Sequence, residues 1–422
     1  MSSEKIIEVE LLPVNIESGI TYSINQANPN SYTHGMFKYP CKFIPEIPRW
    51  AIKKYLDKTL DNAMVFDPFS GSGTTLLEAN LNGIDACGTE IDEIAKLIIT
   101  VKTTTLKKEE LKLLDYYYLE IINVISDSNA NVFRPEINNL EHWFSDQTII
   151  DLGKIRFYLN NIENKHIRDF FELCLVSIVK KVSYADDTSP KPYVSSKIIK
   201  NPQPVEKEFS NIYQRYKKMV IELSNKEKLG KTKILNGDAL NFSMSNEIDL
   251  AITSPPYINA FDYGRTLRLE NLWLSTLTEE QLRKKKKFYV GTEKINVNKE
   301  KDNLEILEKS ELLKQYYAAI KEIDEKRALI VKKFFEDMEV NLQCVYKQLK
   351  KNGVYVIVIG NSNIRKNIIE SWKVIEEIAK SIGYKTEDYF NYIIRNPYIR
   401  IPRKGVGGQI SKDYVLILKK ER

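Results

Sequence analysis

The chain has 422 residues, of which 43% are hydrophobic and 28% charged, a composition typical of a globular protein and not of a disordered or collagen-like one. Its net charge is +6, from 63 Lys and Arg against 57 Asp and Glu, which permits a polyanionic partner without requiring one. No apolar run approaches the roughly 20 residues that cross a bilayer and no signal peptide is evident, so we expect a cytoplasmic protein with no membrane partner. Four scattered cysteines and three isolated histidines predict neither a disulfide framework nor a metal site.

The first predicted unit of the chain is a strand, a loop, a helix and a second strand. Residues 63–66 are a short apolar run, a loop rich in Gly, Ser and Thr follows, and the pattern TTLLEANLNG after it is helical. A parallel pair of strands needs a crossover of a dozen or more residues, so this unit predicts an α/β protein with a parallel sheet. The pattern returns later, and at least six strands fit one doubly wound sheet: 63–66, 85–89, 233–236, 248–253, 354–359 and 414–418.

Two stretches fall outside that sheet. Between 106 and 230, long segments place apolar residues at helical spacing, and between 277 and 340 the chain is rich in Lys and Glu. We therefore predict one core interrupted by a large helical insertion and a smaller charged insertion. The predicted segments are 1–105, 231–276 and 341–422 for the core, 106–230 for the helical insertion and 277–340 for the charged one.

A glycine-rich loop, DPFSGSGTT, follows the first predicted strand and opens the helix after it. Open α/β sheets bind ligands at this edge, and glycines let the backbone approach a ligand closely. The loop lacks the Lys of GxxxxGK[ST], and GxGxxG fails because Leu76 stands three positions after Gly73. Asp67 at the loop and Glu90 after the second strand are placed to bond a ribose diol. A nucleoside-type cofactor is therefore favoured over a plain tight turn.

A rigid loop, TSPPY, follows the predicted strand at 248–253. Consecutive prolines cannot continue a sheet ladder, so the carbonyl groups of this loop are left for other partners. The Ser254 hydroxyl and the Pro255 carbonyl could accept hydrogen bonds from an exocyclic base amine, whose lone pair is otherwise delocalised into the ring. Tyr257 could stack on a base taken out of a duplex. The predicted catalytic residues are Ser254, Pro255, Pro256 and Tyr257, and the alternative is a stiff turn at the strand exit.

Together, DPFSGSGTT and TSPPY resemble the motifs of the S-adenosylmethionine-dependent DNA amino-methyltransferases, which modify N4 of cytosine or N6 of adenine. HGMFKYPCKFIPEIP (34–48) is similar to the family's N-terminal cofactor motif, and segments 349–362 and 400–420 resemble its last strands. The resemblance implies a Rossmann-like, seven-stranded methyltransferase sheet and S-adenosyl-L-methionine as cofactor. It places the glycine loop and 34–48 at the methionine end, Glu90 at the ribose and Asp238 near the adenine. The implied cofactor-binding residues are Phe43, Pro45, Asp67, Pro68, Phe69, Gly71, Ser72, Gly73, Thr74, Glu90 and Asp238.

The first residue of the tetrapeptide SPPY (Ser254 to Tyr257) indicates which atom of the base is methylated. Family members with Ser there mostly methylate N4 of cytosine, whereas Asp or Asn usually signals N6 of adenine, so Ser254 favours cytosine N4. Carbon-5 methylation would need a nucleophilic thiolate, and the one Pro-Cys pair, Pro40-Cys41, lies before the glycine loop. Adenine N6 and an RNA base amine remain alternative targets. An inert DNA-binding subunit is disfavoured by the intact motifs, and a dehydrogenase by the missing third glycine.

The implied substrate is double-stranded DNA, and a restriction endonuclease of the same specificity is a candidate functional partner. Either insertion could contact DNA. The lysine-rich run that contains Lys284 and Lys285 could neutralise phosphates, although a charge run is as often a solvated surface. Tyr193, in a loop rich in Lys, Pro and Ser, and Arg403, in the closing segment, are the other DNA-binding candidates.

Overall fold

A single large sheet organises the computed structural model, which describes residues 5–26, 28–40, 42–56, 62–197, 199–245, 247–258, 262–395 and 411–421. Within these residues nine strands pair in the order β1-β2-β10-β11-β7-β6-β3-β4-β5, and β8 and β9 form a separate hairpin. The strands are β1 (Ile6–Val9), β2 (Thr21–Ile24), β3 (Met64–Asp67), β4 (Asp85–Gly88), β5 (Thr232–Ile234), β6 (Ile248–Thr253), β7 (Leu349–Gly360), β8 (Ser362–Ile364), β9 (Asn367–Ile369), β10 (Tyr384–Ile393) and β11 (Lys412–Lys420).

The predicted Rossmann-like α/β fold is confirmed. All six predicted strands are present, and β11 is the one strand of the described sheet that runs antiparallel to its neighbours, β7 and β10. Seven strands, from β10 to β5, make up the expected sheet, and β2 and β1 extend it beyond β10 in parallel. The sequence analysis missed β10, β1 and β2. The first half of β10 carries charged residues at partly exposed positions, and β1 alternates between exposed and half-buried, so neither has the continuous apolar run of a central strand.

Helices cover both faces of the sheet, as the burial of β7 shows. Val354, Val356 and Val358 pack in the core under α1 (Glu46–Tyr55) and α2 (Thr74–Leu81). The alternate residues Tyr355 and Ile357 pack in the core under α14 (Glu325–Gln348) and α15 (Ser371–Ile382). Successive side chains of a strand point to opposite faces, so this run of apolar residues is buried from both sides.

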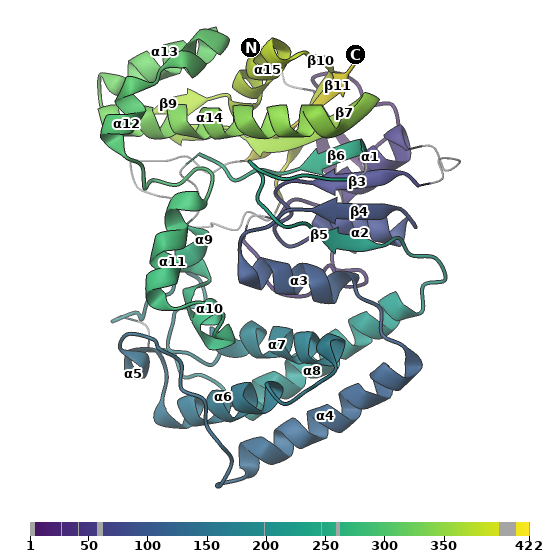
Figure 1. Ribbon diagram of the computed structural model, residues 1–422, viewed down its shortest axis with the longest axis vertical. Coiled ribbons are helices and arrows are strands. Elements are labelled where there is room, and N and C mark those ends of the chain that lie inside the picture. The colour runs from purple at the N-terminus through teal and green to yellow at the C-terminus, as the bar shows by residue number, and fades with distance from the viewer. Residues whose placement is uncertain are drawn as a thin grey trace.

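A separate helical layer lies beyond the edge of the sheet at β5 (Figure 1). It consists of α4 (Lys108–Ser126), α5 (Leu140–Trp143), α6 (Asp146–Leu159), α7 (Lys165–Val179) and α8 (Val205–Ser224). Their apolar residues share one core with α3 (Glu93–Thr103) and α10 (Arg268–Leu274). The layer thus includes α10, which lies outside the predicted insertion 106–230, while α14 runs across the predicted boundary at 340 onto the sheet. The proposed division of the chain stays a prediction.

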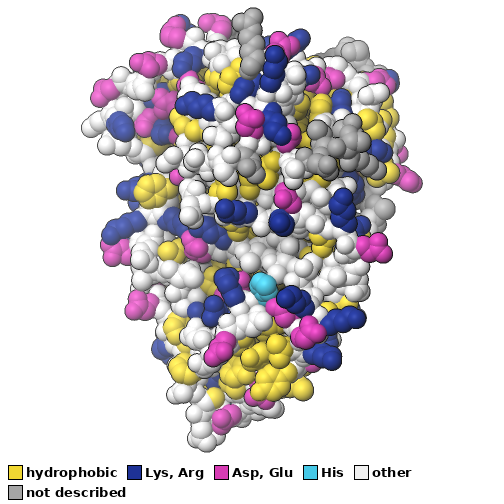
Figure 2. All heavy atoms as spheres, turned by 45° about the vertical axis from the view of Figure 1, so that its right-hand side comes forward, with side chains coloured by type: hydrophobic (Ala, Val, Ile, Leu, Met, Phe, Trp, Pro, Cys, Tyr) yellow, Lys and Arg dark blue, Asp and Glu magenta, His cyan; other side chains and the backbone are white. Residues whose placement is uncertain are grey.

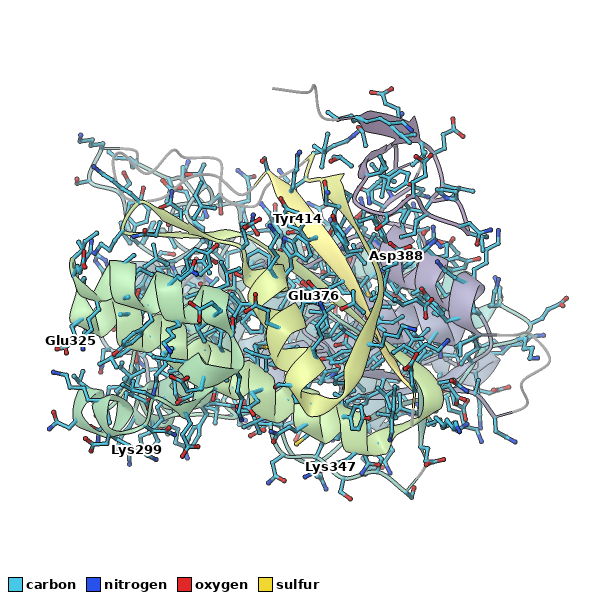
Figure 3. The ribbon with its side chains drawn as sticks, turned by 90° about the horizontal axis from the view of Figure 1, so that it is seen from above. Lys299, Glu325, Lys347, Glu376, Asp388 and Tyr414 are labelled. Atoms are coloured by element: carbon cyan, nitrogen blue, oxygen red, sulfur yellow. The ribbon has the colours of Figure 1, made fainter. Side chains whose placement is uncertain are left out.

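Basic side chains cross the middle of one face of the molecule, at the level where the sheet and the helical layer meet (Figure 2). The remaining helices of the described chain are α9 (Tyr263–Thr266), α11 (Glu279–Lys285), η1 (Lys286–Phe288), α12 (Val297–Asp302), η2 (Glu305–Lys309) and α13 (Glu311–Lys321). Seen from above, α15 crosses strands β10 and β11 beside α14, and Glu376 of α15 accepts a hydrogen bond from Thr386 of β10 (Figure 3). None of the described helices is both long and apolar enough to span a membrane.

Candidate active site

The glycine loop takes its shape from two residues with positive φ. Gly71 has φ of +50° and Gly73 of +74°, a region that side-chain-bearing residues rarely adopt. Gly73 is the N-cap of α2, and its N–H donates to the Ser70 carbonyl at 2.7 Å. A Cβ at Gly73 would also lie 3.0 Å from the Ile99 side chain. The loop is therefore a tight turn that requires glycine and turns the start of α2 toward the carboxyl edge of the sheet.

Asp67 lies beneath this loop and ties it to the strand that carries the proposed catalytic residues. Its Oδ1 accepts hydrogen bonds from the Phe69 N–H at 3.0 Å and the Thr253 hydroxyl at 2.6 Å. Its Oδ2 is buried and has no partner among the described residues. Burial raises the pKa of Asp67 to about 6, and the bond from Thr253 partly opposes that shift. Asp67 thus joins the end of β3 to the end of β6.

Glu90 follows β4 and closes the other side of the loop. Its Oε2 accepts from the Gly71 N–H at 2.9 Å, and its Oε1 accepts from the N–H groups of Ile91 and Asp92 at 2.7 and 2.8 Å. Burial raises the pKa of Glu90 to about 7. Three backbone donors therefore hold this carboxyl group in one orientation at the wall of a pocket.

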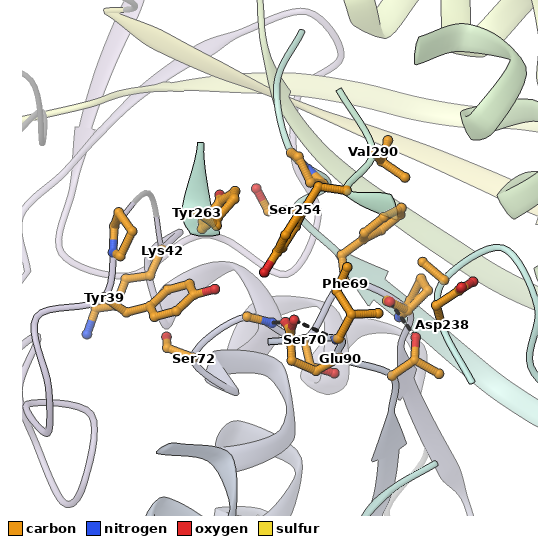
Figure 4. A pocket seen from close by; sticks show the side chains of 18 of the residues that line it. Tyr39, Lys42, Phe69, Ser70, Ser72, Glu90, Asp238, Ser254, Tyr263 and Val290 are labelled. Carbon is orange, nitrogen blue, oxygen red and sulfur yellow. Dashed lines mark hydrogen bonds between the residues drawn. The ribbon is translucent and has the colours of Figure 1, made fainter. Parts of the chain in front are cut away.

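The pocket encloses about 790 Å³, including space open to solvent, and lies where the loops after β3, β4, β5 and β6 meet (Figure 4). It brings together ten of the fifteen residues proposed for cofactor binding and catalysis. These are Phe43, Pro68, Phe69, Gly71, Ser72, Thr74, Glu90, Asp238, Ser254 and Pro256.

The other five proposed residues lie close to the pocket without lining it. Asp67 lies under the glycine loop, Gly73 ends that loop as the N-cap of α2, and Pro45 is the N-cap of α1. Pro255 is buried at the exit of β6. The Tyr257 hydroxyl donates to Asp413 Oδ1 at 2.5 Å.

Several residues that the sequence analysis missed complete the pocket. Tyr39, Tyr263 and Tyr289 form a row with ring centroids 5.9 and 6.2 Å apart and nearly parallel planes. The Tyr289 hydroxyl donates to Asp92 Oδ2 at 3.2 Å. Lys42 lines the end of the pocket near Phe43. Tyr39 and Lys42 stand inside the N-terminal motif and could have been found there, whereas Tyr289, from the charged stretch, has no sequence signal.

The residues proposed to contact DNA differ in how exposed they are and in their partners. Lys284 pairs with Glu280 at 2.7 Å on the surface of α11, whereas Lys285 is largely buried and pairs with Glu93 of α3 at 3.2 Å. The half-exposed Tyr193 donates to Asp186 at 3.1 Å. Arg403 lies outside the described residues. Across the described chain no group of three or more His, Cys, Asp or Glu residues could hold a metal ion.

This geometry is typical of α/β proteins that bind a nucleotide-type cofactor, because a glycine loop after β3 and a carboxylate after β4 line one pocket at the carboxyl edge of the sheet. The profile of the DNA methylase family, the N6 and N4 methyltransferases, matches residues 15–100. The type II methyltransferase M.MvaI of Kocuria varians is 25% identical over 93% of this chain and 92% of its own length. M.BsoBI of Geobacillus stearothermophilus is 29% identical over 61% and 55%, and M.AvaI of Nostoc sp. is 24% identical over 86% and 81%. These matches support an N6/N4 DNA methyltransferase of the type II restriction–modification kind, which implies S-adenosylmethionine as methyl donor and DNA as substrate.

Proposed function

We propose that this chain transfers a methyl group from S-adenosylmethionine to N4 of cytosine at a specific site in double-stranded DNA. One observation carries the proposal: Ser254, at the exit of β6, lines the same pocket as Glu90 and the glycine loop. Ser254, the proposed acceptor for the amine, and the proposed cofactor-binding residues therefore line the same pocket. Ser as the first residue of the tetrapeptide is the reason to favour cytosine over adenine.

The pocket fits this cofactor by its polar groups. The hydroxyl oxygens of Ser72 and Thr74 are buried without a partner in the described residues, and both residues line the pocket. Buried polar groups are rarely left unpaired, so these hydroxyls indicate a polar ligand. We assign the methionine end to Ser72, Thr74 and Lys42, because the ammonium group of Lys42 suits a carboxylate. We assign the ribose hydroxyls to Glu90 and the adenine side to Asp238.

When bound, S-adenosylmethionine supplies an electrophilic methyl group on a sulfonium. The chain's own part is to orient the amine that attacks it. The Ser254 hydroxyl and the Pro255 carbonyl accept the two N–H groups, which favours a tetrahedral nitrogen and frees its lone pair. Pro256 has a φ fixed by its ring, so the loop stays rigid while the base enters. The Tyr257 ring stacks on the flipped base.

The DNA approaches, in this proposal, along the basic band between the sheet and the helical layer (Figure 2). Lys284, Tyr193 and Arg403 remain candidates for that contact, whereas the pairing of Lys285 with Glu93 favours a structural role for Lys285. We further propose that the enzyme is cytoplasmic and shares its recognition sequence with a restriction endonuclease.

The test is to incubate the purified chain with cofactor and unmodified duplex DNA, and then to sequence the modified bases. We expect N4-methylcytosine at one short sequence. N6-methyladenine would refute the choice of base and retain the family, while transfer to RNA in preference to duplex DNA would refute the substrate. Ser254→Ala serves as the control, because it should bind the cofactor normally and modify the DNA far more slowly.

A further inference from the structure

The hydroxyl of Tyr257 is held by a residue far along the chain. Asp413, the second residue of β11, pairs with Gly360 at the end of β7 and with Tyr392 near the end of β10. Because β11 runs antiparallel to both neighbours, it begins at the edge of the sheet where they end. That edge is also where β6 ends and the Ser-Pro-Pro-Tyr loop begins, so Asp413 meets Tyr257 there.

Each oxygen of the Asp413 carboxylate accepts a hydrogen bond from one tyrosine hydroxyl. Asp413 is 6% exposed, its Oδ1 accepts from the Tyr257 hydroxyl at 2.5 Å, and its Oδ2 accepts from the Tyr392 hydroxyl at 2.9 Å. No Lys, Arg or His of the described chain forms an ion pair with it. Burial raises the pKa of Asp413, and the two hydroxyls oppose that shift. A buried carboxylate with no cation among the described residues is costly, so a role other than stability is expected of it.

The geometry supplies such a role. A ring that only stacks on a base needs no hydroxyl, since phenylalanine offers the same face. The Tyr257 hydroxyl instead donates to a buried carboxyl oxygen of Asp413 at 2.5 Å. The bond restricts the side-chain torsions of Tyr257, while the ring of the preceding Pro256 fixes the φ of that proline. Tyr392 in turn fixes the carboxylate.

We propose that Asp413 is a positioning residue for methyl transfer: through the hydroxyl of Tyr257 it holds the ring at the angle at which the flipped base stacks, and Tyr392 holds Asp413. The inference rests on the proposed function, because it takes Tyr257 to be the base-stacking residue. It predicts that the hydroxyl matters for turnover, although it does not itself touch the base, and that its effect disappears once Asp413 is changed.

A double-mutant cycle tests this with Tyr257→Phe, Asp413→Ala and the double variant. Binding of S-adenosylmethionine is measured by calorimetry, and kcat and KM are measured with unmodified duplex DNA. We expect cofactor affinity within about twofold of the unmutated chain and a kcat reduced about tenfold in each single variant. The double variant should be reduced by no more than either single variant, because both remove the same bond.

A matched control is Tyr213→Phe, which removes another bond from a buried tyrosine to an aspartate, Tyr213 to Asp115 at 2.7 Å in the helical layer. It should leave kcat unchanged. The same cycle is measured for thermal unfolding, which reports whether the bond is present regardless of activity.

Different failures point to different parts of the reasoning. If the unmutated chain transfers methyl groups and Tyr257→Phe does so equally well, the role given to Asp413 is overturned. If the two single losses multiply, so that the double variant has a roughly 100-fold lower kcat, the two residues act independently. That result would also overturn the role given to Asp413. If the unmutated chain transfers no methyl group to any duplex DNA, the proposed function fails, and with it the role of Tyr257.

Discussion

Lys42 gives the sharpest test of how the pocket would hold its cofactor. Its ammonium group donates to the His34 carbonyl at 2.8 Å, and no described carboxylate lies within ion-pair distance of it. Burial lowers the pKa of Lys42, and Glu46, the acid that partly opposes that shift, already accepts a hydrogen bond from Gln26 at 2.7 Å. Burial lowers the pKa of His34 to about 4, so that ring is neutral at pH 7. The charge of Lys42 is thus available for a ligand.

The perturbation is Lys42→Met, which keeps the length of the side chain and removes the charge. A hydrogen bond to a charged group contributes about 1.5–3 kcal/mol, and about 1.4 kcal/mol corresponds to a factor of ten. We therefore expect Lys42→Met to weaken S-adenosylmethionine binding by about 10- to 100-fold. The matched control is Lys38→Met, because Lys38 is exposed and does not line the pocket. The affinity of Lys38→Met for S-adenosylmethionine should equal that of the unmutated chain.

The assay is calorimetry with two ligands, S-adenosylmethionine and its decarboxylated analogue. Both carry the sulfonium and the nucleoside, and only the first carries the carboxylate. The unmutated chain should prefer the first, and Lys42→Met should bind both about equally. An equal loss of affinity for both ligands would refute the reasoning, since Lys42 would then shape the pocket without contacting the carboxylate.

Three further predictions follow from the loops of the site. Ser254→Ala should lower kcat by about 100-fold with cofactor affinity unchanged, as steady-state kinetics and calorimetry would report, and normal turnover would contradict its role as acceptor. Gly73→Ala should destabilise the fold by about 1–2 kcal/mol in urea unfolding, because its φ is +74° and the new Cβ would press on Ile99. Gly264→Ala is the control, because a Cβ at Gly264 would make only ordinary van der Waals contacts. Since burial raises the pKa of Glu90 to about 7 and the ionised form is the better acceptor for ribose hydroxyls, cofactor affinity should rise between about pH 6 and pH 8 and then level off. Glu90→Gln should show no such rise, and a flat profile for the unmutated chain would contradict the assignment.

The sequence by itself determined the parts of this protein that depend on neighbours in the chain. The apolar run at 354–359 is buried on both faces of the sheet, so it reads as a strand without knowledge of its partners. Gly71 and Gly73 mark a turn that requires positive φ, and Pro255 and Pro256 mark the exit of a strand. Because parallel strands end at one edge, these loops were expected to meet there.

Only the tertiary structure decided which distant residues share that edge. Tyr289 reaches the pocket from a stretch whose sequence is simply charged, and Lys285 of the same stretch is occupied by Glu93. Asp413 meets Tyr257 across 156 positions of sequence because β11 runs against its neighbours and so begins where they end. The local pattern of a strand specifies its two faces and says nothing of its direction or neighbours. Those are set by how the whole sheet packs, and in this protein they decide which side chain holds the proposed base-stacking tyrosine.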